Sequence, residues 1–85
     1  MTQNFIESNI RTYNSLMQSI DSSKESKSSK QTVRKALLQN MSSFYQELNN
    51  ELYKEADSLE NPSFRSKEDL LDKLDVMLSK LEAEI

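Results

Sequence analysis

Carboxylates are the only side chains in this sequence with both the chemistry and the spacing expected of a general acid or base. The chain has no Cys and no His, so it lacks a thiolate or imidazole nucleophile and the usual zinc ligands. Glu47, Glu51 and Glu55 follow one another at four-residue intervals, which places them on one face of a helix. Such a ladder on a solvated helix face needs no catalytic role. We therefore expect no catalytic residue and no enzyme activity.

Metal and cofactor sites are disfavoured by the same absences. Di-iron helical bundles use Glu-x-x-His motifs, and helix-loop-helix calcium sites need a Gly among their carboxylates. Phosphate-cradling and dinucleotide loops also depend on Gly, and this chain contains none. The sequence therefore predicts no cofactor, no bound metal and no small-molecule substrate, and it favours a binding protein.

The elements that must position any binding residues are amphipathic helices. In the first, apolar residues recur at steps of four, three, four and three, which is typical of one helix face: Ile6, Ile10, Tyr13, Met17 and Ile20. Phe5 and Leu16 widen this stripe. Asn4, with Glu7 three residues later, predicts a capping box. We therefore expect a helix over residues 4–20.

A polar linker and a long helix follow. Residues 21–30 contain five Ser, three Lys and no apolar residue, so they cannot bury apolar surface and predict a linker over 21–29. Ser28 or Ser29 can cap the helix after it. That helix is predicted over 30–59, because apolar residues recur at a mean step of about 3.7: Val33, Leu37, Met41, Phe44, Leu48, Leu52, Ala56 and Leu59.

Pro62 predicts the end of the long helix, because proline disfavours the α conformation of the residue before it. We expect a turn over 60–65 and a third helix over 66–85, with Ser66 and Asp69 as a capping box. The apolar stripe of that helix comprises Leu71, Leu74, Leu78, Leu81 and Ile85. The predicted fold is all-α, a single domain over 1–85 with the second and third helices as an antiparallel hairpin. The first helix either closes a three-helix bundle or packs on a partner in a helical assembly.

The net charge of −3 is unevenly distributed. Residues 1–43 carry six basic and three acidic side chains, whereas residues 44–85 carry five basic and eleven acidic ones. A basic pole is predicted around the linker, with Lys27, Lys30, Arg34 and Lys35. An acidic pole is predicted around the second turn, with Asp57, Glu60 and Asp69. Solvated helix faces would account for both poles; alternatively, the polarity orients an antiparallel contact with another chain.

Candidate contact residues are apolar side chains on the flanks of the second and third stripes. Tyr45 directly follows Phe44, and adjacent helical residues point about 100° apart, so both cannot face one seam. Core packing and partner contact both remain open for these side chains. The candidates for partner contact are Leu38, Tyr45, Tyr53, Leu70 and Met77.

The expected partner is another protein or a second copy of the chain. Nucleic acid is disfavoured because the chain is acidic and its basic cluster has no interleaved aromatic residues. A membrane is disfavoured because no apolar run is long enough to span one and no apolar anchor flanks the basic linker. Without signal-peptide features at its start, the protein is expected to be soluble and intracellular.

Two function classes remain. At 35% hydrophobic residues the chain is lean for a self-sufficient core, since about 45–50% is usual. The long helix, at roughly 40–45 Å, also exceeds its neighbours at roughly 25–30 Å. Both observations favour a small helical subunit, adaptor or co-chaperone of a larger assembly. The alternative is an autonomous acidic inhibitor, such as an immunity protein, an antitoxin or a phage anti-host factor.

Overall fold

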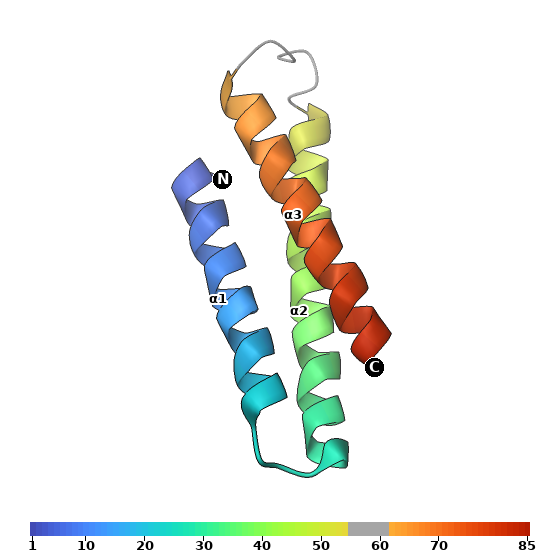
Figure 1. Cartoon of the computed structure of the whole chain (residues 1–85). Coiled ribbons are helices and arrows are strands. Elements are labelled where there is room, and N and C mark those ends of the chain that lie inside the picture. The colour runs from blue at the N-terminus through green and yellow to red at the C-terminus, as the bar shows by residue number, and fades with distance from the viewer. Residues whose placement is uncertain (55–61) are drawn as a thin grey trace.

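The computed structural model describes residues 1–54 and 62–85, and it is all-α in that part of the chain (Figure 1). Helix α1 spans Gln3–Ser22, α2 spans Lys27–Lys54 and α3 spans Pro62–Glu84. Helices α1 and α3 run in one direction and α2 runs in the other. The Cα atoms extend over 48 × 18 × 17 Å. The prediction of three helices with no strand is confirmed for the described residues.

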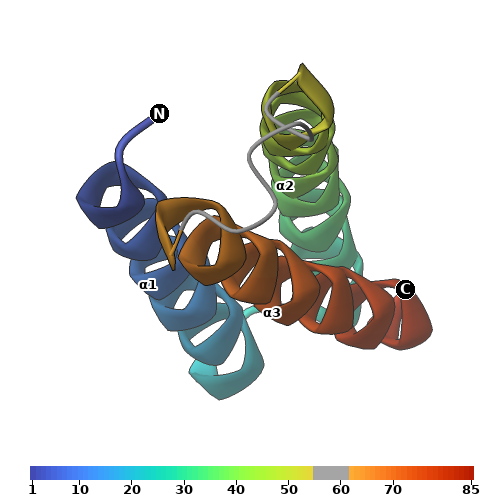
Figure 2. The ribbon, with the colours of Figure 1, turned by 90° about the horizontal axis from the view of Figure 1, so that it is seen from above.

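Helices α2 and α3 form the largest interface, as an antiparallel hairpin requires, and α1 packs against both of them. Figure 2, a view from above, shows that α3 crosses the bundle obliquely. Its first turns lie beside α1 and its last turns lie beside α2. The first helix therefore closes a three-helix bundle within the chain. The oblique path of α3 leaves one side of the α1–α2 pair without a covering helix.

The start of α1 differs from the predicted cap. The helix begins at Gln3, and the hydroxyl of Thr2 accepts a hydrogen bond from the Phe5 amide at 3.1 Å. The predicted Asn4–Glu7 capping box is therefore wrong, because Asn4 is already inside the helix. Glu7 instead accepts a hydrogen bond from the side chain of Gln3 at 3.2 Å. Thr2 offers the same kind of acceptor oxygen two positions earlier.

The connection between α1 and α2 is shorter than the predicted linker over 21–29. Only residues 23–26 lie outside the two helices. Ser26 caps α2, because its hydroxyl accepts a hydrogen bond from the Ser29 amide at 3.2 Å and its carbonyl accepts one from the Lys30 amide at 3.0 Å. The prediction that Ser28 or Ser29 caps this helix is wrong. In a serine-rich run several residues have capping chemistry, so composition alone does not select one.

Helix α3 begins at Pro62, so the predicted turn over 60–65 is wrong for residues 62–65. Proline is favoured at the first helical position because the amide hydrogen it lacks would have no partner there. Ser66 consequently lies inside the helix, and the predicted box with Asp69 does not form. The predictions for Ala56, Asp57, Leu59 and Glu60 lie outside the described residues.

One core runs along the bundle and draws on all three helices. Its buried members are Ile6, Met17, Ile20, Leu37, Met41, Phe44, Leu48, Leu52, Phe64, Leu70, Leu71, Leu74, Leu78 and Leu81. Most members of the three predicted stripes are among them, since helical periodicity places these residues on one face. Phe44 links α2 to α1, with its ring 5.8 Å from the ring of Tyr13 and 6.2 Å from that of Phe5.

Four stripe residues fall short of the predicted burial. Val33 and Ile85 are exposed, and Ile10 and Tyr13 are half-buried. Ile85 follows the last residue of α3, so its side chain extends past the end of the bundle. Val33 lies near the start of α2 on the side that α3 leaves open, and its exposure contributes to the site described next.

Candidate partner-binding groove

A groove of about 440 Å³ lies between the second half of α1 and the first half of α2. Its apolar lining residues are Leu16, Ile20, Val33, Ala36 and Leu37, and its polar ones are Ser19, Ser23, Glu25, Lys30 and Asn40. No residue of α3 contributes to it. On α2, helical periodicity places the groove residues Val33, Ala36 and Asn40 on the flank opposite to Arg34, which contacts α3. The groove therefore opens on the face away from α3.

The rims of this groove are apolar and exposed, whereas its floor is buried. Leu16 on α1 is 45% exposed and Val33 on α2 is 46% exposed, while Ile20 and Leu37 beneath them are buried. Phe5, also about half exposed, lies eleven residues before Leu16. That separation is close to three helical turns and places Phe5 on the same side of α1. Large side chains in this position lose contact with water only when another element covers the face.

The charged residues along the groove face differ between its two ends. Lys30 and Glu25 line the groove near the connection between α1 and α2. Glu47 lies farther along α2 and close to Tyr13. Burial raises the pKa of the Tyr13 phenol above its usual value, and the negative charge of Glu47 raises that pKa further. Within the described part of the chain, neither Lys30 nor Glu47 takes part in an ion pair.

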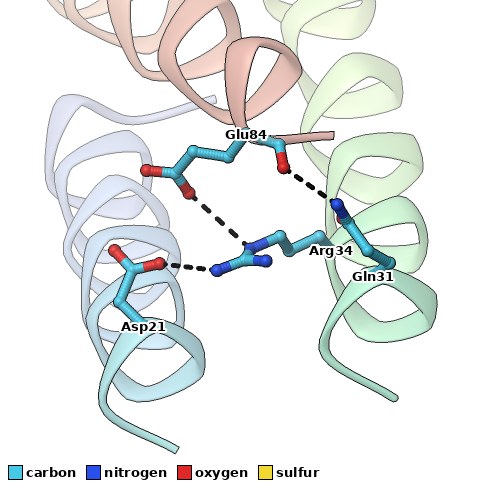
Figure 3. Close-up of polar contacts among 4 residues, drawn as sticks. All are labelled: Asp21, Gln31, Arg34 and Glu84. Carbon is cyan, nitrogen blue, oxygen red and sulfur yellow. Dashed lines mark hydrogen bonds and ion pairs between the residues drawn. The ribbon is translucent and has the colours of Figure 1, made fainter. Parts of the chain in front are cut away.

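Arg34 lies on the other side of α2 and connects all three helices (Figure 3). Its guanidinium is 3.0 Å from the carboxylate of Asp21 on α1 and 3.7 Å from that of Glu84 on α3. The side-chain amide of Gln31 donates a hydrogen bond to the Glu84 carbonyl at 3.0 Å. The Arg34 side chain is only 13% exposed. Arg34 therefore connects the helices of its own bundle, and this member of the predicted basic pole is not free on the surface.

The other members of the predicted poles are distributed as follows. Lys27 and Lys35 are exposed on α2, Lys30 is half-buried at the groove, and Asp69 is exposed on α3. A second bridge closes the opposite end of the α1–α2 pair, where the amino group of Met1 forms an ion pair with Glu51. The cations near the connection therefore differ, because Arg34 joins the helices, Lys30 borders the groove, and Lys27 and Lys35 are exposed to solvent.

The five predicted contact residues do not form one exposed patch. Leu70 is a core residue at 7% exposure. Leu38, Tyr45 and Met77 are half-buried and pack against the core. Tyr53 is 82% exposed. Of these positions, Tyr53 alone offers most of its side chain to a partner.

The exposed apolar residues at the groove were not among the predicted contact residues. Phe5 and Leu16 belong to the predicted widening of the first stripe, and Val33 is the first member of the second stripe. Their hydrophobicity and spacing were recognisable in the sequence, but they indicate only which helix face is apolar. The position of α3 determines which flank of that face remains uncovered.

Among the described residues, no helix is both long enough and apolar enough to cross a membrane. No protein-family model matches the chain, and no curated protein and no solved structure shows significant similarity to it.

Proposed function

We propose that this chain is a non-catalytic protein–protein interaction module that binds a helix in the groove between α1 and α2. The observation that carries this proposal is the exposure of Leu16 and Val33, at 45% and 46%, above a buried apolar floor. Amphipathic helices commonly bind by laying an apolar face into such a groove. The module would serve as a subunit, adaptor or co-chaperone of a larger intracellular assembly.

The shape of the site favours a helix as the occupant. The groove is bounded by two antiparallel helices, and a further helix lying along them would complete a four-helix arrangement, with α3 on the far side. Covering the exposed half of Leu16 and of Val33 would contribute about 1 kcal/mol each from apolar burial. Phe5 extends the same face by about 16 Å along α1 from Leu16. The Asp21–Arg34 contact aligns the two helices so that Val33 lies about 9 Å beyond Leu16 in the other direction, so a helix of roughly five turns would reach all three side chains.

A display library of amphipathic helical peptides, selected for binding to the folded protein, tests this proposal. The selected peptides should bind the wild type and should bind Leu16→Glu and Val33→Glu at least about ten-fold more weakly, because each substitution places a charge in the apolar contact. Val76→Glu, at an exposed position on α3, is the matched control and should bind like the wild type. Selection of no binders, or of binders that are insensitive to both groove substitutions, would contradict the proposal.

An autonomous acidic inhibitor is the second candidate, and the exposed surface of α3 favours it. Glu68, Asp69, Asp72 and Asp75 are all exposed in the first and middle turns of this helix. Such a carboxylate cluster complements a basic surface on a target. A basic protein or peptide that binds Asp69→Asn/Asp72→Asn more weakly, but is indifferent to Leu16→Glu, would support this candidate over the groove.

A further inference from the structure

We propose that the helix held in the groove carries a basic side chain, preferably an arginine, that lies between Phe5 and Glu47 at the end of the groove face away from the α1–α2 connection. This inference rests on the proposed function and states the chemistry of the partner. Elsewhere the bound face of that helix is apolar, so that it covers Leu16 and Val33.

Glu47 lies on the flank of α2 that faces the groove. Val33, Asn40 and Glu47 recur at seven-residue steps, close to two helical turns, so they point to one side of α2 within about 40°. Val33 and Asn40 line the groove, and Glu47 is exposed about 21 Å beyond Val33. Lys54, one further step along, ends α2 beyond the level at which α1 begins. A helix of roughly five turns that covers the groove therefore passes Glu47.

The carboxylate of Glu47 lies close to an exposed aromatic ring of α1. The rings of Phe5 and Phe44 are 6.2 Å apart, and Glu47 follows Phe44 by three residues, which makes the two neighbours on α2. Burial, and then the charge of Glu47, raise the pKa of Tyr13 on α1, so this carboxylate lies toward α1. Phe5 is 53% exposed. A planar guanidinium can stack on such a ring and pair with the carboxylate at once.

The charge of Glu47 is not compensated within the described part of the chain, where it takes part in no ion pair. Glu51, one turn farther along α2, is paired with the amino group of Met1. At the other end, Glu25 and Lys30 line the groove together, so their opposite charges offset each other. Covering Glu47 with an apolar side chain would withdraw an unpaired carboxylate from water, which is unfavourable. A basic side chain makes the same contact attractive.

The flank of α1 that faces the groove adds no charge of its own. Its residues recur at alternating steps of four and three, as on one helix face, and all are uncharged: Phe5, Asn9, Thr12, Leu16 and Ser19. Glu47 is therefore the charge that an occupant of this face has to match between the groove and the start of α1.

The test uses the tightest-binding peptide from the helical display library and measures its affinity for the wild type, Glu47→Lys and Glu25→Lys. The peptide should carry Arg or Lys about seven or eight residues from the apolar residue that covers Leu16. Glu47→Lys should bind it about ten-fold more weakly, because the attraction becomes a repulsion. Glu25→Lys is the matched control, the same charge change at the opposite end, and should alter affinity by no more than about two-fold.

Reciprocal exchange shows whether the two side chains meet. Replacing the basic residue of the peptide with Glu should weaken binding to the wild type and restore binding to Glu47→Lys, while circular dichroism establishes that each variant is folded. A nitroxide attached to the peptide beside its basic residue should broaden the amide NMR signals of Phe5 and Glu47 and leave those of Ser23 and Lys30 sharp. The opposite pattern would overturn the proposed position.

The remaining outcomes separate this inference from the function on which it rests. Peptides that bind in a Leu16-dependent manner, but lack a basic residue and bind Glu47→Lys like the wild type, overturn the inference and leave the proposed function standing. A dimer of the protein alone that Leu16→Glu dissociates would assign the face to a second copy and also overturn the inference. Absence of any peptide binding overturns the inference and the proposed function together.

Discussion

The guanidinium of Arg34 lies 3.0 Å from the carboxylate of Asp21, and this ion pair joins α2 to the end of α1 across the short connection between them. Glu84, 3.7 Å from the same guanidinium, extends the contact to the end of α3. One nearly buried cation thus holds the ends of two helices against a third. The two carboxylates compensate the positive charge of a side chain that is largely withdrawn from water.

Replacing Arg34 with Gln should lower the free energy of unfolding by about 1–2 kcal/mol, because the hydrogen bond to Asp21 and the ion pair with Glu84 are lost from a largely buried position. Lys35→Gln is the matched control, since Lys35 is exposed, and it should change stability by no more than about 0.5 kcal/mol. Urea denaturation followed by circular dichroism measures both variants. Equal stability of the Arg34→Gln and Lys35→Gln variants would show that the Arg34 contacts do not stabilise the bundle.

Leu74→Ala should destabilise the protein by about 2–5 kcal/mol, because Leu74 has no exposed surface and its removal leaves a cavity in the core. That loss is a large fraction of the stability expected for a small domain. Val76→Ala removes an exposed side chain from the same helix and should be nearly neutral. A Leu74→Ala variant that unfolds at the same urea concentration as Val76→Ala would contradict the core assignment.

Helical periodicity accounts for the part of this fold that could be predicted from the sequence. Leu48, Leu74 and Leu81 are buried because they recur on one face of their helices, whatever the packing angle. The flanks of those faces depend on where the third helix crosses. Leu38 and Leu16 each flank an apolar stripe, yet Leu38 packs against the core and Leu16 is half exposed at the open groove. Both leucines have the same position in the sequence pattern, beside an apolar stripe. The pattern therefore could not predict which of them borders an open groove.

The stability of the protein should fall more steeply above pH 10 in the wild type than in Tyr13→Phe. The pKa of Tyr13 is raised in the folded state, first by burial and then by Glu47, from a usual value of 10.0. Below that pH both states hold the proton and the full contribution is present. As the pH rises through and above 10 the unfolded chain loses the proton first, so the free energy of unfolding decreases.

The measurement is chemical denaturation at several pH values between neutrality and the alkaline limit of folding. The difference in unfolding free energy between the wild type and Tyr13→Phe should be constant up to about pH 9 and should then change in favour of the variant. Tyr53→Phe is the control, because Tyr53 is exposed and this variant removes a phenol hydroxyl without changing the core. A pH-independent difference for Tyr13→Phe would show that the phenol is not in the environment described.

The residue that caps α2 can be identified by substituting the neighbouring serines one at a time. Ser26→Ala should cost about 1 kcal/mol, because the Ser29 amide, which now donates to the Ser26 hydroxyl, loses its acceptor. Ser28→Ala should be neutral or slightly stabilising, since position 28 is inside the helix and alanine has the higher helix propensity. Thermal and urea denaturation of the two variants give the comparison directly. A larger loss of stability for Ser28→Ala than for Ser26→Ala would mean that Ser28 caps the helix. Helix α2 would then begin after Lys27, and the connection between α1 and α2 would be longer than residues 23–26.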